Sequence, residues 1–437
     1  MKLNNLSNIL VPIETSSREL VYKIYLCHHL AEKGFRCYLG HKSYINYLVK
    51  NLKGYIYLDK GYHKGVSEKI YKTVKRNDGI IVSLDEEGAV DYSDGSTLLG
   101  RYSKALFDNA DLTFMWGNKQ YDLVKNNMNN ETKAVVTGHP RFELLKPEFH
   151  YFYQNEVNNI KKKFQDFILI NTNMGFGNNI RGDHFVKLNY GDRFKTIDRI
   201  IAFDKKKLKT FRSLVIKLSE QLNKTIVFRP HPEEDQSFYL DAFKNINNAH
   251  IIYEGSVIPW ILAADLMIHP DCTTAIESLF LGKKPLSLLP NDYPAGLITH
   301  LPLEASECFT SDDEVISFIN NMDSLENVDL KNYPFAEKYF SISEGITKLI
   351  VNEINQLSNI QPRQIDKKLT IKKKAYLFYM YLRSKQKIFD SDKLIQNKLT
   401  GFNSNNIRAL NKTIIKHNNQ FSAVKCRTIN NNLYLYQ

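Results

Sequence analysis

The sequence lacks the features that define several common protein classes. Its cysteines are few and scattered, at positions 27, 37, 272, 308 and 426, and they form no C-x-x-C pair. This pattern argues against a disulfide framework or a zinc site and favours a reducing compartment. No apolar run reaches 18 residues, so we expect no transmembrane helix. The opening MKLNNLSNILVPIE has no small-residue cleavage site, so it reads as a first β-strand rather than a signal peptide.

Several catalytic motifs are also missing. The first strand is not followed by G-x-G-x-x-G, and the chain has no G-x-x-x-x-G-K-[ST], H-E-x-x-H or G-x-S-x-G. The missing motifs therefore argue against a dinucleotide-binding protein, a P-loop protein, a zinc protease and an α/β-hydrolase. No D-x-D pair follows a strand predicted in the N-terminal half. We therefore expect no metal and no cofactor beyond the substrates.

Positive charge is concentrated in the last part of the chain. The whole chain carries +12, and residues 361–437 contain 16 Lys and Arg against three Asp and Glu. Residues 1–360 are therefore close to neutral. A near-neutral body without a nucleic-acid-binding motif makes nucleic acid a poor partner.

Short apolar strands alternate with helical stretches, which predicts two α/β domains with parallel sheets. Asn8–Ile13 is a predicted strand, and Ser16 with Glu19 fits a capping box that opens a helix. The other predicted strands are Arg36–Leu39, Gly79–Leu84, Leu112–Trp116, Ala134–Thr137, Phe167–Asn171, Thr225–Phe228, His250–Tyr253, Leu266–His269 and Pro285–Leu289.

The spacing of these strands predicts the division of the chain. We expect a first domain over 1–150, a linker over 151–166, a second domain over 167–358 and a basic extension over 359–437. Open α/β sheets bind ligands at the carboxyl ends of their strands. Polar motifs that follow predicted strands are therefore the candidate sites.

The first such motif is acidic. Asp85, Glu86 and Glu87 follow the strand GIIVSL and precede Gly88. Adjacent carboxylates repel one another, so we expect at least one raised pKa, which suits a general base. Gly88 would let the turn adopt unusual dihedral angles. The alternative is a solvated acidic loop.

The second motif follows the strand TIVF. Two prolines, including Pro232, fix the directions of Arg229 and His231, a pair suited to phosphate. The alternative is a rigid turn with a structural histidine.

The third motif follows the strand LMIH. Thr273 and Thr274 are expected at a helix N-terminus, where hydroxyl and N–H groups can bind an anion, and Glu277 lies in the first turn. Helix capping is the alternative. A fourth motif, TGHPRF, carries His139 and Arg141, which are candidates for contact with donor or acceptor or parts of a structural turn.

Together these motifs resemble GT-B glycosyltransferases that use CMP-activated acidic sugars. Bacterial sialyltransferases of that class have a [DE]-[DE]-G motif, then H-P, then a Ser/Thr pair. This chain has the same order in Glu86-Glu87-Gly88, His231-Pro232 and Thr273-Thr274.

Residues 8–300 are also similar to the bacterial surface carbohydrate biosynthesis proteins, related to 3-deoxy-octulosonate (Kdo) transferases. The matching segments are VPIETSSREL, DEEG, TGHPRF, ILINTN, RPHP and HPDCTTAIESLFLGKKPL. The resemblance implies two Rossmann-like domains with a central cleft.

The resemblance also implies roles for single residues. Glu87 or Glu86 would deprotonate the acceptor hydroxyl, or a carboxylate, with Asp85 also a candidate, would act as nucleophile. His231, Thr273 and Thr274 would stabilise the departing CMP phosphate. The other residues assigned to the donor are Arg229 at the phosphate or the sugar carboxylate, Glu277 at the ribose, Ser256 and Val257 at the base, and Pro232 and Asn171. Gly88, His139 and Arg141 would lie on the acceptor side.

The implied function is transfer of an acidic keto sugar, of Kdo or nonulosonate type, from a CMP-sugar to a surface polysaccharide or lipid-linked acceptor. The alternatives are a CDP-alditol phosphotransferase-like enzyme, a UDP-sugar transferase or epimerase of similar fold, and a non-catalytic scaffold. We expect a cytoplasmic protein peripheral to the inner membrane. Lys372-Lys373-Lys374 beside the aromatic stretch 375–382 suits an anionic membrane surface, or else a solvated helix packed on the body.

Overall fold

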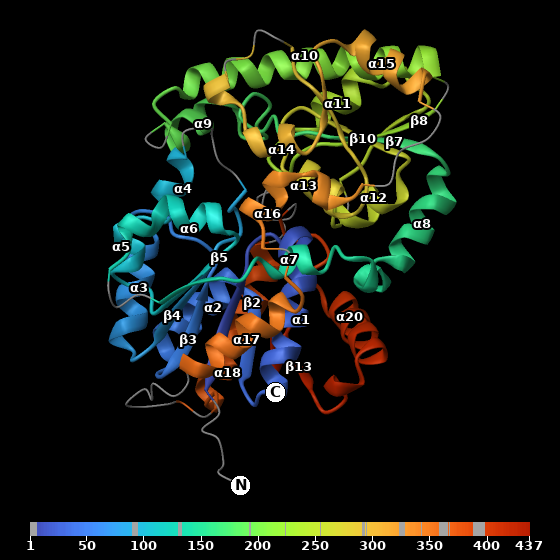
Figure 1. Cartoon of the computed structure of the whole chain (residues 1–437). Helices are drawn as coiled ribbons and strands as arrows, with labels where there is room; N and C mark the ends of the chain where they lie inside the picture. The colour runs from blue at the N-terminus through green and yellow to red at the C-terminus, as the bar shows by residue number, and fades with distance from the viewer. Residues whose placement is uncertain are drawn as a thin grey trace. The chain divides into compact units, whose positions relative to one another are not determined.

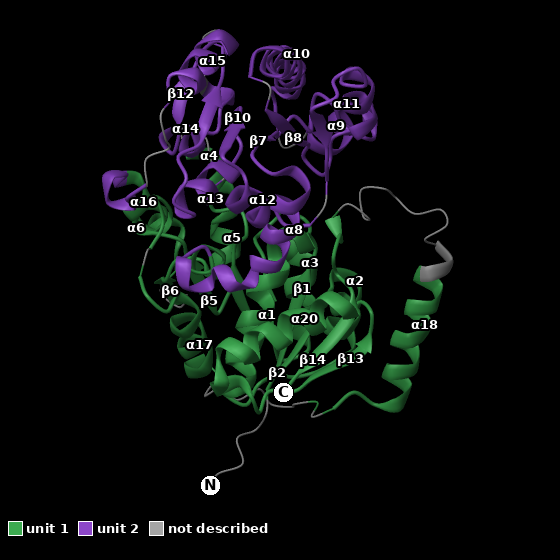
Figure 2. Cartoon of the chain, turned by 90° about the vertical axis from the view of Figure 1, so that its right-hand side faces the viewer, with its two compact units in different colours: residues 1–88, 95–144, 335–437 green, residues 89–94, 145–334 purple. Residues whose placement is uncertain are grey.

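The computed structural model of the chain forms two compact α/β units (Figures 1 and 2). Unit 1 comprises residues 1–88, 95–144 and 335–437, and unit 2 comprises residues 89–94 and 145–334. The residues that the structure describes are 7–89, 95–129, 133–191, 194–222, 224–253, 255–290, 293, 295–322, 328–341, 343–357, 366, 368–387 and 398–437.

The sheet of unit 1 has the strand order β13-β14-β2-β1-β3-β4-β5-β6. Its strands are β1 (Asn8–Ile13), β2 (Arg36–His41), β3 (Tyr55–Asp59), β4 (Ile80–Leu84), β5 (Leu112–Met115), β6 (Lys133–Val136), β13 (Cys426–Asn430) and β14 (Leu433–Tyr436). The first six strands are parallel, whereas β14 pairs antiparallel with both β2 and β13. Every residue of β1 and β3 is buried, as expected where helices cover both faces of a parallel sheet.

Helices flank the sheet of unit 1 (Figure 1). They are α1 (Ser16–Glu32), α2 (Lys42–Asn51), α3 (Ser67–Arg76), α4 (Ser96–Arg101), α5 (Lys104–Phe107), α6 (Asn118–Val124), α7 (Pro140–Glu143), α17 (Ile346–Leu357), α18 (Ile371–Lys387) and α20 (Ser404–His417), with α16 (Pro334–Tyr339) at the unit boundary. Helix α1 contacts α7, α17 and α20, while α2 contacts α3. Side chains of α2, α3 and α18 share one apolar core with the sheet.

The start of α1 differs from the predicted capping box. Thr15 is the N-cap residue and makes no side-chain cap bond. The carboxylate of Glu19 accepts hydrogen bonds from the backbone N–H groups of Glu14 and Thr15, at 3.2 and 3.0 Å. The Ser16 hydroxyl instead donates to the carbonyls of residues 398 and 400, at 3.2 and 2.7 Å. The Ser16 half of the prediction was therefore wrong, because this hydroxyl holds α1 against a distant segment.

The sheet of unit 2 has the strand order β12-β11-β10-β7-β8-β9 and is parallel throughout. Its strands are β7 (Phe167–Asn171), β8 (Thr225–Arg229), β9 (Ala249–Ile251), β10 (Leu266–His269), β11 (Leu286–Leu288) and β12 (Glu307–Phe309). Its helices are α8 (Gln154–Phe164), α9 (Gly182–Tyr190), α10 (Ile197–Leu222), α11 (Gln236–Ala242), α12 (Ile258–Ala263), α13 (Thr274–Phe280), α14 (His300–Glu304) and α15 (Asp312–Asn320).

The unit boundaries differ from those predicted. The main part of unit 2 begins at 145 and includes the predicted linker, where α8 packs on α12 through the rings of Phe164 and Trp260, 5.7 Å apart. Residues 335–357 belong to unit 1, although they were predicted in the second domain. The predicted boundary at 358 lies outside the described residues. The expected extension instead supplies α18, α20 and two strands to unit 1.

Both sheets reverse their strand order beside their first strand. In unit 1, β2 and β3 lie on opposite sides of β1, and in unit 2, β8 and β10 lie on opposite sides of β7. In open α/β sheets, ligands bind at the carboxyl ends of strands at such a reversal. The loops that follow these strands are therefore where each unit can hold a ligand.

Candidate functional site

The three consecutive carboxylates after β4 have different environments. Asp85 and Glu86 are 2% and 1% exposed, whereas the Glu87 side chain is 33% exposed. Asp85 is paired with Arg101, whose Nε lies 2.7 Å from its carboxylate. The same carboxylate accepts the backbone N–H of Glu87 at 3.0 Å. Asp85 therefore shapes the loop and is not available to a substrate.

Glu86 lies at the centre of a buried network. The Tyr22 hydroxyl donates to one carboxylate oxygen of Glu86, and the ammonium of Lys23 lies 2.8 Å from the same oxygen. The other oxygen is 3.8 Å from Nε2 of His139. Each of these side chains is buried. Glu86 can therefore influence chemistry only through its neighbours.

Glu87 is the accessible member of the triplet. Its carboxylate lies 2.9 Å from Arg101 and 3.5 Å from Arg18. Burial acts to raise its pKa, but the charges of Arg101, Arg18 and Lys60 outweigh burial and hold that pKa well below its usual range. The expectation of a raised pKa was wrong for Glu87, because cations rather than carboxylates dominate its surroundings. Glu87 is anionic at neutral pH.

The network continues to the strand reversal of unit 1. Glu19 of α1 lies 2.8 Å from Lys23 and 2.9 Å from Lys60, which follows β3. Lys60 also lies 3.2 Å from Glu14, at the end of β1. Burial acts to raise the pKa of Glu14, but Lys60 and Lys42 lower it to about 2. Alternating charges thus join the loops after β1, β3 and β4.

His139 and Arg141 lie beside this network. His139 is 1% exposed, and its ring lies against Tyr22 and Trp116, at 4.9 and 5.0 Å. Its Nδ1 accepts the backbone N–H of Arg141 at 3.1 Å, and Arg141 lies 5.4 Å from the centre of the Trp116 ring. Burial, aided by Arg141 and Lys23, places the His139 pKa well below its usual range, so this imidazole is neutral. The packing fits the structural alternative for His139.

Gly88 is needed for a reason other than the one predicted. Its φ is not in the left-handed region. A Cβ at this position would instead lie 2.6 Å from the Trp116 ring. The Trp116 indole donates to the carbonyl of Asp85 at 2.7 Å. The ring therefore holds the acidic loop in place, and only a residue without a side chain fits beneath it.

In unit 2, Glu234 joins the loops after β7 and β8 through hydrogen bonds. Its buried carboxylate accepts hydrogen bonds from the Thr172 hydroxyl at 2.8 Å and from the N–H groups of Met174 and His231 at 2.9 and 3.0 Å. The Tyr239 hydroxyl also donates to it. Burial outweighs these hydrogen bonds and raises the pKa of Glu234 to about 7.

His231 is held by this arrangement and remains half-buried, as does Pro232. Its Nδ1 accepts the backbone N–H of Glu233 at 3.3 Å. Nδ1 also lies 3.4 Å from where a Cβ of Gly175 would be, so the ring lies close to the loop after β7. The Pro-His-Pro sequence and Glu234 together fix the imidazole at the carboxyl edge of the sheet.

Arg229, at the end of β8, is turned toward protein groups. It is 6% exposed, and its guanidinium lies 5.1 Å from the Trp260 ring and 5.9 Å from the Tyr253 ring. It donates to the carbonyl of Gly255 at 3.3 Å. Arg229 therefore helps to position Tyr253 and Gly255, and the next residues, Ser256 and Val257, are half-buried.

The predicted residues of β7 and α13 lie together at the strand reversal of unit 2. The Asn171 amide lies 3.5 Å from the Thr274 hydroxyl. Thr273 is the N-cap residue of α13 but makes no side-chain cap bond, and both threonines are half-buried. Glu277 is 8% exposed, and burial together with Glu277 raises the pKa of Tyr153.

A buried ion-pair group lies beneath these residues. Lys207 of α10 is 3.0 Å from Asp271 and 3.2 Å from Asp204. Asp271 also accepts from Asn173 at 2.8 Å and from the N–H of Thr299 at 3.3 Å. This group ties the loops after β7 and β10 to α10.

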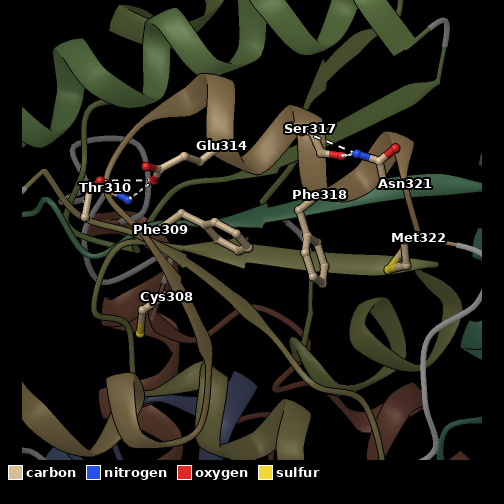
Figure 3. A pocket seen from close by; sticks show the side chains of 8 residues that line it. All are labelled: Cys308, Phe309, Thr310, Glu314, Ser317, Phe318, Asn321 and Met322. Carbon is tan, nitrogen blue, oxygen red and sulfur yellow. Dashed lines mark hydrogen bonds between the residues drawn. The ribbon is translucent and has the colours of Figure 1, made fainter.

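Two hollows of unit 2 lie at the edges of its sheet, and no predicted site residue is among the residues that line them. One, of about 670 Å³, lies between β12 and α15, where the rings of Phe309 and Phe318 lie together (Figure 3). The other, of about 820 Å³, borders β9 and includes His250. Within the described residues, no three His, Cys, Asp or Glu side chains are grouped to hold a metal ion.

Solved structures of similar fold exist, whereas neither a family profile nor a curated protein matches the sequence. The wall teichoic acid polymerase TagF, in a crystal soaked with CDPG, aligns with a TM-score of 0.51 at 11% identity, over 82% of this chain and 90% of that chain. MnaA of S. aureus with UDP aligns with a TM-score of 0.51 at 14% identity, over 84% and 100%. These chains have the GT-B fold, so the predicted fold class is confirmed.

Sequence reasoning missed the partners that hold the site residues. In unit 1 these are Arg18, Glu19, Tyr22, Lys23, Lys60 and Arg101, and in unit 2 they are Asn173, Asp204, Lys207, Glu234 and Asp271. The spacing of Glu19 and Lys23, four residues apart in a helix, was a usable signal. Lys207 gave none, because it is one of three adjacent lysines in α10.

Proposed function

We propose that this chain is a glycosyltransferase that transfers an acidic keto sugar, of Kdo or nonulosonate type, from a CMP-activated donor to a surface polysaccharide or lipid-linked acceptor. One observation carries the proposal. Of three carboxylates at the end of β4, Glu87 alone is substantially exposed, and it is held anionic by two arginines. An anionic carboxylate in the loop after β4 suits attack on the anomeric carbon of a sugar, whereas its lowered pKa makes it a weaker base for the acceptor proton.

In this reaction the acceptor oxygen forms a bond to the anomeric carbon while the bond from that carbon to the CMP phosphate oxygen breaks. The acceptor proton passes to Glu87 and then to solvent. If Glu87 instead attacks the anomeric carbon first, its oxygen displaces CMP, and the acceptor oxygen then displaces Glu87 while the acceptor proton passes to solvent. Asp85 and Glu86 act as positioning residues, since both are buried in ion pairs.

Unit 2 supplies the groups for the nucleotide. His231 and the hydroxyls of Thr273 and Thr274 donate to the phosphate, whose charge grows as the bond breaks. Asn171 positions Thr274. Arg229 holds the Gly255 carbonyl next to Ser256 and Val257, which read the base, and Glu277 binds the ribose.

A second candidate is a transferase or epimerase that uses a CDP- or UDP-linked substrate. It is favoured by the two structural neighbours, whose crystals contained CDPG and UDP. Thermal shifts with CMP, CDP, UDP and GDP separate the two. We expect CMP to stabilise the chain most, and a larger shift with CDP or UDP would favour the second candidate. No shift with any nucleotide would indicate a non-catalytic scaffold.

The role of Glu87 is tested by turnover. We expect Glu87→Gln to lower transfer or hydrolysis of a CMP-Kdo or CMP-sialate donor by about a hundredfold or more, with the CMP-induced thermal shift unchanged. Asp122→Asn, at an exposed carboxylate of the same unit, should leave turnover unchanged. Full turnover of the Glu87→Gln protein would refute the assignment.

The role of His231 is tested with a matched histidine. His231→Ala should lower turnover by about a hundredfold and also reduce the CMP-induced shift, because it removes a phosphate donor. His250→Ala, at the exposed β9 edge, should change neither. Equal effects of the two substitutions would count against a phosphate site after β8.

A further inference from the structure

Helix α18 of unit 1 exposes large apolar side chains at high density. The described part of the chain has 12 exposed large hydrophobic residues, and five of them lie within Ile371–Leu382. Ile371 is 85% exposed, Phe378 54%, Tyr379 53% and Leu382 47%. Figure 2 shows α18 on the outside of unit 1. The clustering is the feature to explain, since single exposed apolar residues are ordinary.

One side of α18 is fixed to unit 1. Leu377 is fully buried, and Met380 and Tyr381 pack against the same apolar core. The ring of Tyr376 stacks on Tyr47 of α2 with centroids 4.8 Å apart. The Asn430 amide also donates to the carbonyl of Leu377 at 3.3 Å. The helix is therefore docked, and its orientation is set by this buried side.

The opposite side is apolar. Ile371, Ala375, Phe378 and Leu382 are spaced by four, three and four residues, so they lie along one side of the helix. All four are exposed, and the stripe that they form faces away from the side that carries Leu377. A helix on the surface of a soluble unit normally has polar residues there. We therefore expect the stripe to be buried against another surface.

The charges beside the stripe indicate what covers it. Lys372, Lys374 and Arg383 flank the stripe, and α18 contains no acidic residue. None of these three cations makes an ion pair among the described residues. Two copies of α18 packed together would bring like charges close without an acidic partner, which disfavours pairing. An anionic lipid surface complements both the cations and the apolar stripe.

We propose that α18 is a membrane-docking helix. It would lie in the plane of an anionic bilayer, with Ile371, Phe378 and Leu382 among the acyl chains and the flanking cations at the lipid phosphates. The aromatic side chains Phe378 and Tyr379 suit the interfacial region of a bilayer. Among the described helices, none combines the length and apolarity needed to cross a membrane. The docking surface is independent of the proposed transferase activity.

The test uses the full chain and sedimentation with phosphatidylcholine vesicles that contain or lack phosphatidylglycerol. Removing the tail would also remove β13 and β14, so point substitutions are required. We expect binding only to the anionic vesicles and weaker binding at high salt. Lys372→Gln, Lys374→Gln and Arg383→Gln together should lower the affinity about a hundredfold, since each cation contributes roughly fivefold. Lys69→Gln, Lys72→Gln and Arg76→Gln on α3 make the same charge change and should have little effect.

The apolar stripe is tested separately. Phe378→Ser with Leu382→Ser should lower vesicle affinity by at least about tenfold, because two apolar side chains no longer leave water. Phe238→Ser with Leu240→Ser on α11, at 40% and 58% exposure, is the matched control. All these side chains are exposed, so circular dichroism melting should be unchanged. Equal binding by the α18 variants and the controls, or no wild-type binding to anionic vesicles, overturns the proposal.

A reporter on the helix distinguishes lipid from a second copy. With anionic vesicles, the tryptophan fluorescence of Tyr379→Trp should shift to shorter wavelength and be quenched by brominated lipid. The fluorescence of Phe238→Trp should show neither change. In analytical ultracentrifugation without lipid we expect the same species for the wild type and the Phe378→Ser, Leu382→Ser variant. A wild-type dimer that this variant converts to a monomer would overturn the proposal in favour of self-association.

Discussion

The loops after β1, β3 and β4 in unit 1 and the loops after β7 and β8 in unit 2 are held by opposite kinds of electrostatics. In unit 1, buried carboxylates alternate with Lys23, Lys60 and Arg101 in direct ion pairs. In unit 2, the loops after β7 and β8 are joined by hydrogen bonds to Glu234, a buried carboxylate without a cation among its hydrogen-bond partners. Cations favour the charged carboxylate, whereas burial without them favours the neutral one.

This difference in carboxylate surroundings gives the two sites opposite pH dependence of stability. Glu14 and Glu87 of unit 1 have lowered pKa values, so their contribution to stability is present above their unfolded pKa and is lost as pH falls. Glu234 of unit 2 has a raised pKa, so its contribution is complete at low pH and is lost as pH rises. Acid should therefore loosen the loops that Glu14 and Glu87 hold in unit 1, and alkali the loops that Glu234 joins in unit 2.

The largest effect is expected from removing the central cation of unit 1. Lys23→Met leaves Glu86 without its ion pair and Glu19 with Lys60 alone, and we expect a loss of about 3–5 kcal/mol in the free energy of unfolding. Urea denaturation measures it. Lys125→Met, which removes an exposed pair with Asp122, should cost less than about 1 kcal/mol.

Equal losses from these two substitutions would contradict the view that unit 1 depends on buried ion pairs. The view is sharpened by adding Glu86→Gln to Lys23→Met. This second change removes a stranded charge, so it should restore part of the lost stability.

The next effect concerns Glu234. Its pKa is about 7 in the folded chain against an ordinary value of 4.5. Below pH 4.5 both states hold the proton and the stabilisation is complete, and it is lost as pH rises through 7. The span corresponds to about 3 kcal/mol. Hydrogen exchange of peptides covering 172–174 and 230–240, corrected for intrinsic rates, should show weaker protection at pH 8 than at pH 5.

Glu234→Gln should abolish this pH dependence, because the amide does not titrate. Glu233→Gln, at the neighbouring half-buried position, should retain it. Protection that increases with pH in the wild type would reverse the assignment for unit 2 and remove the contrast between the two sites.

The smallest effect tests the packing that holds the acidic loop. Gly88→Ala places a Cβ 2.6 Å from the Trp116 ring, and we expect a loss of about 1–3 kcal/mol from overpacking. Gly100→Ala is the matched control, since nothing lies within 4 Å of its Cβ and it occupies helix α4. That change should stabilise by up to about 1 kcal/mol. An unchanged free energy of unfolding in Gly88→Ala would show that the loop after β4 can move to accept the added Cβ.

Alternation of apolar runs predicted the α/β class and ten strand positions, because strands buried on both faces are nearly continuous apolar runs. β3 was missed, since YIYLD looks amphipathic and polar residues surround it. β13 and β14 were missed because their pairing with β2 depends on a distant segment. Long-range pairing leaves no trace in local composition.

The positions of the candidate site residues were predictable from the sequence to the same extent as the strands. Motifs after strands placed Glu87, His231 and Thr274 at the carboxyl ends of strands, which follows from the topology of open sheets, and their roles stay predictions. The exposure of each carboxylate at 85–87 was not predictable, because it depends on where Arg18 and Arg101 reach. Gly88 was identified for the wrong reason, since only the fold brings Trp116 above it.

The hairpin of β13 and β14 has a consequence for how the chain is made. Unit 2 draws its whole sheet from consecutive segments between residues 167 and 309, so it can fold while synthesis continues. The β2 edge of unit 1 stays open until Leu433–Tyr436 leaves the ribosome. An open edge is a template for pairing with other chains. Nascent chains stalled between residues 309 and 433 would therefore have a complete unit 2 sheet and an unpaired β2 edge in unit 1.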